Sequence, residues 1–252
     1  MVQHPDLRPN ENHSIERGGW FAALSSPLRQ TILARARVRH VGRGTLLVRR
    51  GDHASDWVGV AAGALRLSTD LCDGRSLMLD LVGPGDWYGD IELLDGGPCK
   101  LQIRVHVKST LLLVCEHDLR SLVQSHPELH EALLQLHCRR LRHMLRRIEE
   151  LQTAPLVQRV AIQLQRLLRQ FGKPGPSGTR IDVALPQSDL ASLLGASRQR
   201  INGVLRAMQA HGVVTTSHAR ITVVDTPRLE ALAQGATLNA EAGGESAFGD
   251  GG

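Results

Sequence analysis

Residues 185–208 read LPQSDLASLLGASRQRINGVLRAM, and this stretch decides the predicted fold of the last third of the chain. Its apolar residues repeat at helical spacing on both sides of Gly195, which predicts two short amphipathic helices that meet at a tight turn. Gly195 can adopt the left-handed conformation that ends the first helix, and Ser197 is placed to cap the second. The stretch therefore predicts a helix-turn-helix.

Polar side chains crowd the first turn and a half of the second predicted helix, the part of a recognition helix that meets base edges in the major groove. Arginine can donate a fork of hydrogen bonds to guanine, and Asn or Gln can bond adenine through two atoms. The alternative is that these residues only cap and solubilise a helix pair in an all-α core. We expect base contacts from Arg198, Gln199 and Asn202, and phosphate contacts from Ser188, Ser197, Arg200 and Arg220.

Two short β-branched segments follow, GVVTT at 212–216 and RITVV at 220–224, around the turn Ser217-His218-Ala219. They predict a hairpin that forms a wing beside the recognition helix, where His218 can reach the phosphate backbone. Residues 185–224 carry four arginines against one aspartate, and residues 156–184 carry five basic residues against one aspartate. This basic surface favours double-stranded DNA as the partner, although a basic region can also be only a solvated surface.

Residues 36–115 change to short apolar runs of strand length, separated by Gly, Pro and Asp turns. Strands at this interval predict an antiparallel β-roll of the jelly-roll type, preceded by a short helix after Ser26. The chain is therefore predicted to be an α+β protein. We expect a disordered N-terminus at 1–16, a β-roll domain at 17–125, a long helix and hinge at 126–154, a winged helix-turn-helix at 155–234 and a disordered tail at 235–252.

The long helix is predicted to run from Pro127 to about Gln152, where Pro155 then ends it and marks a hinge. Its apolar residues step by four and three, as in the seam of a coiled coil. Such a stripe packs on the β-roll, on a second copy of the helix, or on both. The predicted dimer interface consists of Leu134, Cys138, Leu141, Leu145 and Ile148.

Other classes of protein find little support in the 252 residues. The four cysteines are widely spaced without a CxxC pair, and no apolar run reaches the length of a membrane span, so we expect a cytoplasmic protein that does not enter membranes. No catalytic triad or phosphate loop appears, and we predict no catalytic residues and no metal site. His126 and His130 have a chelating spacing, but such a pair is more often an exposed helix start. A second hypothesis remains: a β-roll enzyme or ligand carrier whose last domain binds proteins.

A β-roll, a long helix and a winged helix-turn-helix in this order resemble the Crp/Fnr family of bacterial transcription regulators. The resemblance covers roughly residues 28–232. It implies a cyclic-nucleotide-binding fold in the first domain, and a homodimer that binds a palindromic operator and works with RNA polymerase. The matching blocks are LVRRGD at 47–52, GALRLS at 63–68, DGRSLML at 73–79, GPGDWYGDIELLDGGP at 83–98 and LASLLGASRQRINGVLRAM at 190–208.

The same resemblance implies where an effector would bind. Cyclic-nucleotide members hold the ligand in a cassette G-E-L…R-[ST], where Glu takes the ribose hydroxyl and Arg the cyclic phosphate. The corresponding residues here are Gly89, Asp90, Ile91, Lys100 and Leu101, with Met144 and Leu145 on the long helix where hydroxyl side chains face the base. Asp is shorter than Glu, and Lys lacks the planar fork of Arg, so tight cyclic AMP binding is not expected. A changed effector, a weakly bound cyclic nucleotide, or control by protein abundance without an effector all stay open.

Overall fold

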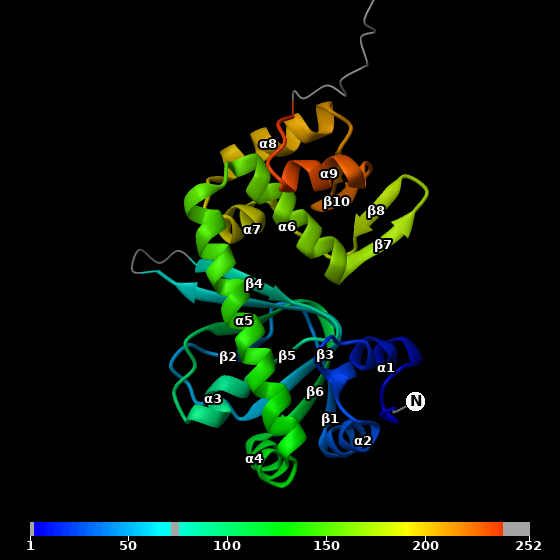
Figure 1. Ribbon diagram of the computed structural model, residues 1–252, viewed down its shortest axis with the longest axis vertical. Coiled ribbons are helices and arrows are strands. Elements are labelled where there is room, and N and C mark those ends of the chain that lie inside the picture. Colours follow the sequence, from blue (N-terminus) through cyan, green and yellow to red (C-terminus); the bar gives the residue numbers. More distant parts are fainter. Residues whose placement is uncertain (1–2, 72–75, 239–252) are drawn as a thin grey trace, which may run out of the picture.

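The computed structural model describes residues 3–71 and 76–238, and its first domain is an antiparallel β-roll (Figure 1). The strands pair in the order β1-β6-β3-β4, with β2 also on β6 and β5 also on β3. Their bounds are β1 Arg37–Val41, β2 Leu46–Val48, β3 Asp56–Asp70, β4 Ser76–Val82, β5 Trp87–Tyr88 and β6 Gln102–Cys115. The predicted α+β fold with an antiparallel roll is confirmed.

The two longest strands, β3 and β6, each join two apolar runs that the sequence pattern predicts as separate strands: 57–60 and 64–68 in β3, and 102–107 and 110–115 in β6. They pair along their whole length, and the register shifts three times between Val60 and Leu65. These β-bulges accommodate the residues between the two apolar runs of β3 without ending the strand. At the bulge Gly63 has φ of +88°, and a Cβ there would lie 2.2 Å from Ser109 Oγ. Only glycine allows the two strands to pass so closely at this point.

The N-terminal segment is folded, so the predicted disorder of residues 1–16 is wrong for the helix α1, Pro9–Glu16. Its side chain Ile15 is fully buried, and Glu11 Oε1 accepts a hydrogen bond of 2.7 Å from Thr110 Oγ1 in β6. A 3-10 turn, η1 (Phe21–Ala23), and α2 (Ser26–Arg35) follow. The predicted disorder was based on the polar composition of the segment, but a few of its side chains are buried and hold it in place. Four rings form one buried cluster on the roll: Trp20, Phe21, Trp57 and Trp87.

Three helices, α3 (Asp90–Asp95), α4 (Glu116–Ser125) and α5 (Pro127–Thr153), complete the first domain, and α5 is the predicted long helix. Leu129 and Leu133 near its start are buried against the β-roll. Figure 1 shows α5 running along the roll to the second domain. The helix ends at Thr153 with Ala154 as its C-cap, and the break before α6 at Pro155 is confirmed.

The second domain is a winged helix-turn-helix, as predicted. Its four strands pair in the order β7-β8-β10-β9. The segment from Gly172 to Gly178, predicted as a linker, instead contains an edge strand, which accommodates Pro174 because an edge residue needs no ladder donor on its outer side. The elements are α6 Leu156–Phe171, β7 Gly172–Gly175, β8 Gly178–Ile181, α7 Gln187–Leu193, α8 Arg198–Ala210, β9 Val214–Ser217, β10 Arg220–Val223 and α9 Thr226–Ala233.

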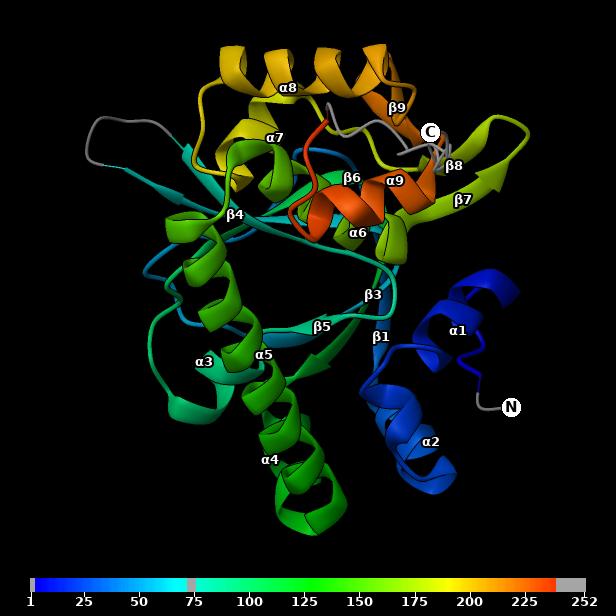
Figure 2. The same ribbon diagram turned by 45° about the horizontal axis from the view of Figure 1, so that its top comes forward.

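The two domains share one hydrophobic core, in which Met78 and Leu81 of β4 pack with the interior of the helix-turn-helix. Polar contacts add to it: the Met78 backbone N–H donates to Ser192 Oγ at 2.6 Å, and Arg66 pairs with Asp189 at 2.6 Å. These contacts place α7 against β4 and leave α8 on the outside of the molecule (Figure 2).

Within residues 3–71 and 76–238, no helix is long and apolar enough to cross a membrane. Cys99, Cys115 and Cys138 are all free thiols. Cys72 and most of the predicted disordered tail, from residue 239 onward, lie outside the described residues.

Candidate nucleic-acid interface

The turn between α7 and α8 has the local structure that the sequence predicts. Gly195 has φ of +58°, a left-handed conformation that favours glycine. Ser197 caps α8, because its Oγ accepts a hydrogen bond from the Arg200 backbone N–H at 3.3 Å. Ile201 and Leu205 are buried beneath α8, so its opposite face is turned toward solvent.

The exposed face of α8 carries the three predicted base readers. Arg198 and Gln199 are exposed, and Asn202 is half-buried. Because a helix turns about 100° per residue, these three side chains start within one arc of about 100°. Asn202 Oδ1 accepts a hydrogen bond from Gln187 Nε2 of α7 at 3.4 Å. The structure thus gathers these residues on one surface; their contacts with bases stay a prediction.

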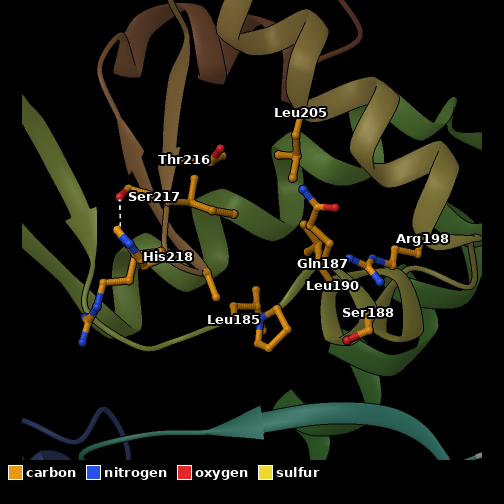
Figure 3. Close-up of a pocket in the computed structure, with 13 residues that line it drawn as sticks. Leu185, Gln187, Ser188, Leu190, Arg198, Leu205, Thr216, Ser217 and His218 are labelled. Atoms are coloured by element: carbon orange, nitrogen blue, oxygen red, sulfur yellow. Dashed lines mark hydrogen bonds between the residues drawn. The ribbon is translucent and has the colours of Figure 1, made fainter.

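A cleft of about 530 Å³ lies between this helix and the wing. In Figure 3, Ser188 and Arg198 lie on one side of the cleft, and Ser217 and His218 lie on the other. Its apolar lining comes from Leu185, Leu190, Leu205 and Ile221. The cleft thus has hydrogen-bond donors from the helix-turn-helix on one wall and from the wing on the other.

The wing is a tight hairpin with a two-residue loop. Ser217 and Arg220 face each other in the ladder, and the loop residues His218 and Ala219 have φ of +47° and +61°. Positive φ at both loop positions defines the type I′ turn that matches the twist of a hairpin. Residues other than glycine adopt it at a cost of about 1–2 kcal/mol each. The Leu185 backbone N–H donates to Ala219 O at 2.7 Å, which ties the wing tip to the start of α7.

Arg220, predicted to contact phosphate, belongs to a cluster around Asp182. The carboxylate pairs with Arg220 at 2.7 Å, with Arg180 at 3.0 Å and with Lys173 Nζ. Burial raises the pKa of Asp182, but the hydrogen bond from Lys173 and the three positive charges outweigh it and hold the pKa below its ordinary value. Three cations on one carboxylate leave two positive charges on this sheet. The sequence analysis singled out neither Arg180 nor Lys173, although the basic composition of 156–184 pointed to this region.

Gly203 is a third residue that the sequence analysis did not single out. It is exposed in the middle of α8, and a Cβ there would meet nothing within 4 Å. It lies four residues after Gln199 and three before Arg206, so all three share one face of the helix. The available signal was an isolated glycine inside a helical pattern. Glycine destabilises a helix interior, so its presence there indicates a packing or functional reason such as a close approach to the backbone.

The segment predicted to bind an effector packs against α5. Gly89 has φ of +97°, and the Asp90 side chain is fully buried. Its Oδ2 accepts hydrogen bonds from His137 Nε2 at 2.6 Å and from Arg140 Nη1 at 2.7 Å. Burial raises the pKa of Asp90, but the hydrogen bond from His137 and the charge of Arg140 outweigh it and lower the pKa. Ile91, by contrast, is 48% exposed.

The remaining residues predicted for the effector pocket differ in their exposure to solvent. Lys100 is exposed and makes no hydrogen bond or ion pair within the part of the chain that the structure describes. Leu101 packs against the core of the roll. Met144 and Leu145 of α5 are 59% and 58% exposed. The seven residues therefore do not line one enclosed cavity in a single protomer.

The predicted dimer seam lies on an open side of α5. Cys138 is exposed. The other four residues of the seam are apolar and exposed to water in a single protomer. A partner that covered them would bury this apolar surface. Their exposed fractions are 57% for Leu134, 58% for Leu141, 58% for Leu145 and 51% for Ile148.

His126 and His130 stand at the start of α5, and His126 Nδ1 lies 2.9 Å from Ser125 Oγ. The described residues contain no group of three or more His, Cys, Asp or Glu side chains placed to hold a metal ion.

Comparison with known proteins agrees with this architecture. Residues 38–126 match the model of a cyclic nucleotide-binding domain, and residues 158–232 match that of a Crp-like helix-turn-helix domain. A cyclic AMP receptor protein of Thermus thermophilus is 30% identical over 193 residues, which cover 77% of this chain and 86% of the relative. The chain belongs to the Crp/Fnr family of transcription regulators.

One more curated relative and one solved structure are similar to this Crp/Fnr protein. A CRP-like cAMP-activated global transcriptional regulator of Mycobacterium tuberculosis is 27% identical over 187 residues, which cover 74% of this chain and 84% of the relative. The crystal structure of FixK2 from Bradyrhizobium japonicum shares the fold, with a TM-score of 0.70, 21% identity, and coverage of 80% of this chain and 99% of that one.

Proposed function

We propose that this Crp/Fnr protein is a dimeric cytoplasmic regulator that reads a palindromic operator with α8 of each protomer. The observation that carries the proposal is the exposed polar face of a capped α8, which stands over a cleft shared with the wing. Arg198, Gln199 and Asn202 share the arc of α8 that can enter the major groove. Their side chains match guanine and adenine edges.

Phosphate contacts position the protein on the duplex. The Ser197 Oγ accepts a hydrogen bond from the backbone, and its O–H can still donate a hydrogen bond to a phosphate oxygen. Arg220 shares Asp182 with two other cations, so its charge is only partly compensated. The phosphate ligands in this proposal are Ser188, Ser197, Arg200 and Arg220, joined by Arg180 and Lys173.

The dimer forms through the exposed seam of α5. Two recognition helices about 34 Å apart match half-sites that are one helical turn apart, which is why a two-fold dimer suits a palindromic operator. The regulator then works with RNA polymerase at promoters, as the resemblance implies.

Selection of bound sequences from random duplex DNA, with the purified full-length protein, tests this function. A palindromic motif is the expected result. Arg198→Ala should weaken binding to that motif by about 1–3 kcal/mol and relax the sequence preference at one position. Arg43→Ala removes an exposed arginine from the turn between β1 and β2 and serves as the control. Recovery of no motif, together with elution from DNA at trivial salt, would contradict the proposal and favour a protein-binding role for the second domain.

A further inference from the structure

The buried carboxylate of Asp90 is the group that the family's cassette would turn toward a ribose hydroxyl. Here both hydrogen bonds to its Oδ2 come from α5, from His137 and Arg140. We propose that this internal ion pair occupies the nucleotide position, and that Asp90 itself holds α5 against the β-roll without a cyclic nucleotide. The proposal concerns the control of the regulator described above and in that respect rests on its proposed function.

The backbone around Asp90 keeps the carboxylate in this orientation. A Cβ on Gly89 would lie 2.9 Å from Asp56 O, so the turn before α3 is pressed onto β3. Arg140 holds the turn from the other side, because its Nη2 donates to Trp87 O at 2.5 Å while Nη1 binds Asp90. The guanidinium therefore spans Gly89 with one contact on each side.

Both hydrogen bonds to the carboxylate occupy Oδ2, the oxygen that His137 and Arg140 share. To reach Oδ2 a ribose hydroxyl would have to displace His137 or Arg140, and a displaced guanidinium would leave the fully buried carboxylate short of its compensating charge. Oδ1 is also buried and has no hydrogen-bond partner among the described residues. Because the whole side chain is buried, a ligand would first have to uncover that oxygen.

The phosphate half of the cassette does not fit a cyclic nucleotide either. Lys100 is exposed and offers a point charge in place of a planar fork, and Leu101 has no hydroxyl. Ile91 is 48% exposed. The residues present therefore do not form the nucleotide site that the family model would imply.

The ion pair matters for DNA binding because α5 connects the two domains. Arg147, two turns after Arg140 on the same face, donates to Leu79 O in the roll at 2.8 Å and to Leu193 O in α7 at 3.4 Å. The helix α5 is thus fixed to the β-roll through Arg140 and to α7, the first helix of the helix-turn-helix, through Arg147. The position of α8 then follows from contacts within the chain.

Two measurements on the full-length protein test the proposal. Calorimetric titration of the wild type with cyclic AMP, and separately with cyclic GMP, is expected to show no saturable binding up to about 1 mM nucleotide. Hydrogen exchange of the α5 amides between 137 and 147, without nucleotide, is expected to become about tenfold faster or more in Arg140→Gln. Arg139→Gln is the matched control, since Arg139 is exposed and makes no hydrogen bond or ion pair within the described residues.

Arg140→Gln leaves a buried charge behind and can fail to fold. The second variant therefore combines Asp90→Asn with Arg140→Gln, a neutral pair of similar size that keeps a donor and an acceptor. The double variant should fold, and its α5 amides should exchange hydrogen more slowly than those of Arg140→Gln alone. A folded double variant beside an unfolded single one also supports the pairing.

Two results would overturn the inference. One is micromolar binding of either nucleotide by the wild type that disappears in Asp90→Asn. The other is α5 exchange in Arg140→Gln that equals the wild type. Neither readout uses DNA, so a failure to select any duplex would refute the proposed function and leave these measurements decisive for the ion pair.

Discussion

Replacing Gly203 with alanine should make the protein more stable and its DNA binding weaker. A glycine in a helix interior costs about 1 kcal/mol relative to alanine, because it loses more backbone freedom on folding. Nothing in the chain lies within 4 Å of the added Cβ, so the full gain should appear in the free protein. For a chain of this size that gain corresponds to a rise in Tm of about 2–4 °C.

The loss of affinity follows from the position of Gly203 on α8. It lies between Gln199 and Arg206 on the face opposite the buried residues, where the major groove would receive the helix. A methyl group there holds the helix away from the base edges and lengthens hydrogen bonds that weaken steeply with distance. We expect Gly203→Ala to lower the affinity for the selected operator about tenfold or more.

Calorimetric unfolding and fluorescence anisotropy with the selected operator measure the two effects on the same samples. Gly42→Ala is the control: its φ is not positive, its added Cβ also meets nothing within 4 Å, and it lies in the β-roll. The control should leave DNA affinity unchanged. A Gly203→Ala protein that is more stable and binds the operator as tightly as the wild type would refute the close approach of DNA to this residue.

Three further predictions concern the dimer seam, the wing and the buried carboxylate. Leu141→Glu should raise the dimer dissociation constant about 100-fold or more without unfolding the protomer, since Leu141 is 58% exposed. Sedimentation equilibrium measures this constant, and an unchanged value would exclude the seam as the dimer interface. Asp182→Asn frees the wing cations and should tighten DNA binding about threefold and steepen its salt dependence, whereas Asp52→Asn in the β-roll should do neither in the same anisotropy titration. Because the folded-state pKa of Asp90 lies below its ordinary value of 3.8, its ionised form stabilises the fold above that pH, and this contribution is lost as the pH falls through the folded pKa. Chemical unfolding between neutral pH and pH 3 should therefore show a shallower acid loss in Asp90→Asn, and equal slopes would contradict the assignment.

The features that the sequence predicted correctly depend on residues close together in the chain. The Gly195 turn, the Ser197 cap and the break at Pro155 each involve only a few neighbouring residues. The length of α5 follows from an uninterrupted helical pattern between two prolines. Propensity, capping and periodicity act over this range, so the pattern alone is enough.

The wrong predictions arise where a distant contact overrides local composition. The polar segment at 9–16 is helical because Glu11 is bonded to Thr110, which lies 99 residues later, and Ile15 is buried in a cluster with Trp57 and Leu112. The predicted linker after Gly172 is a strand because β8 pairs with it. Neither partner is visible in the local pattern.

The sequence by itself determined the family architecture: a β-roll, a long helix and a helix-turn-helix whose polar face suits DNA. Only the tertiary structure decided what the altered cassette does. Asp90 reads as a shortened ligand residue in the sequence, but it meets His137, 47 residues later, and Arg140, 50 residues later, inside the protein. Likewise, the wing cations appear as separate charges until folding brings them to Asp182. A buried ion pair depends on which elements pack together, and residue spacing does not encode that packing.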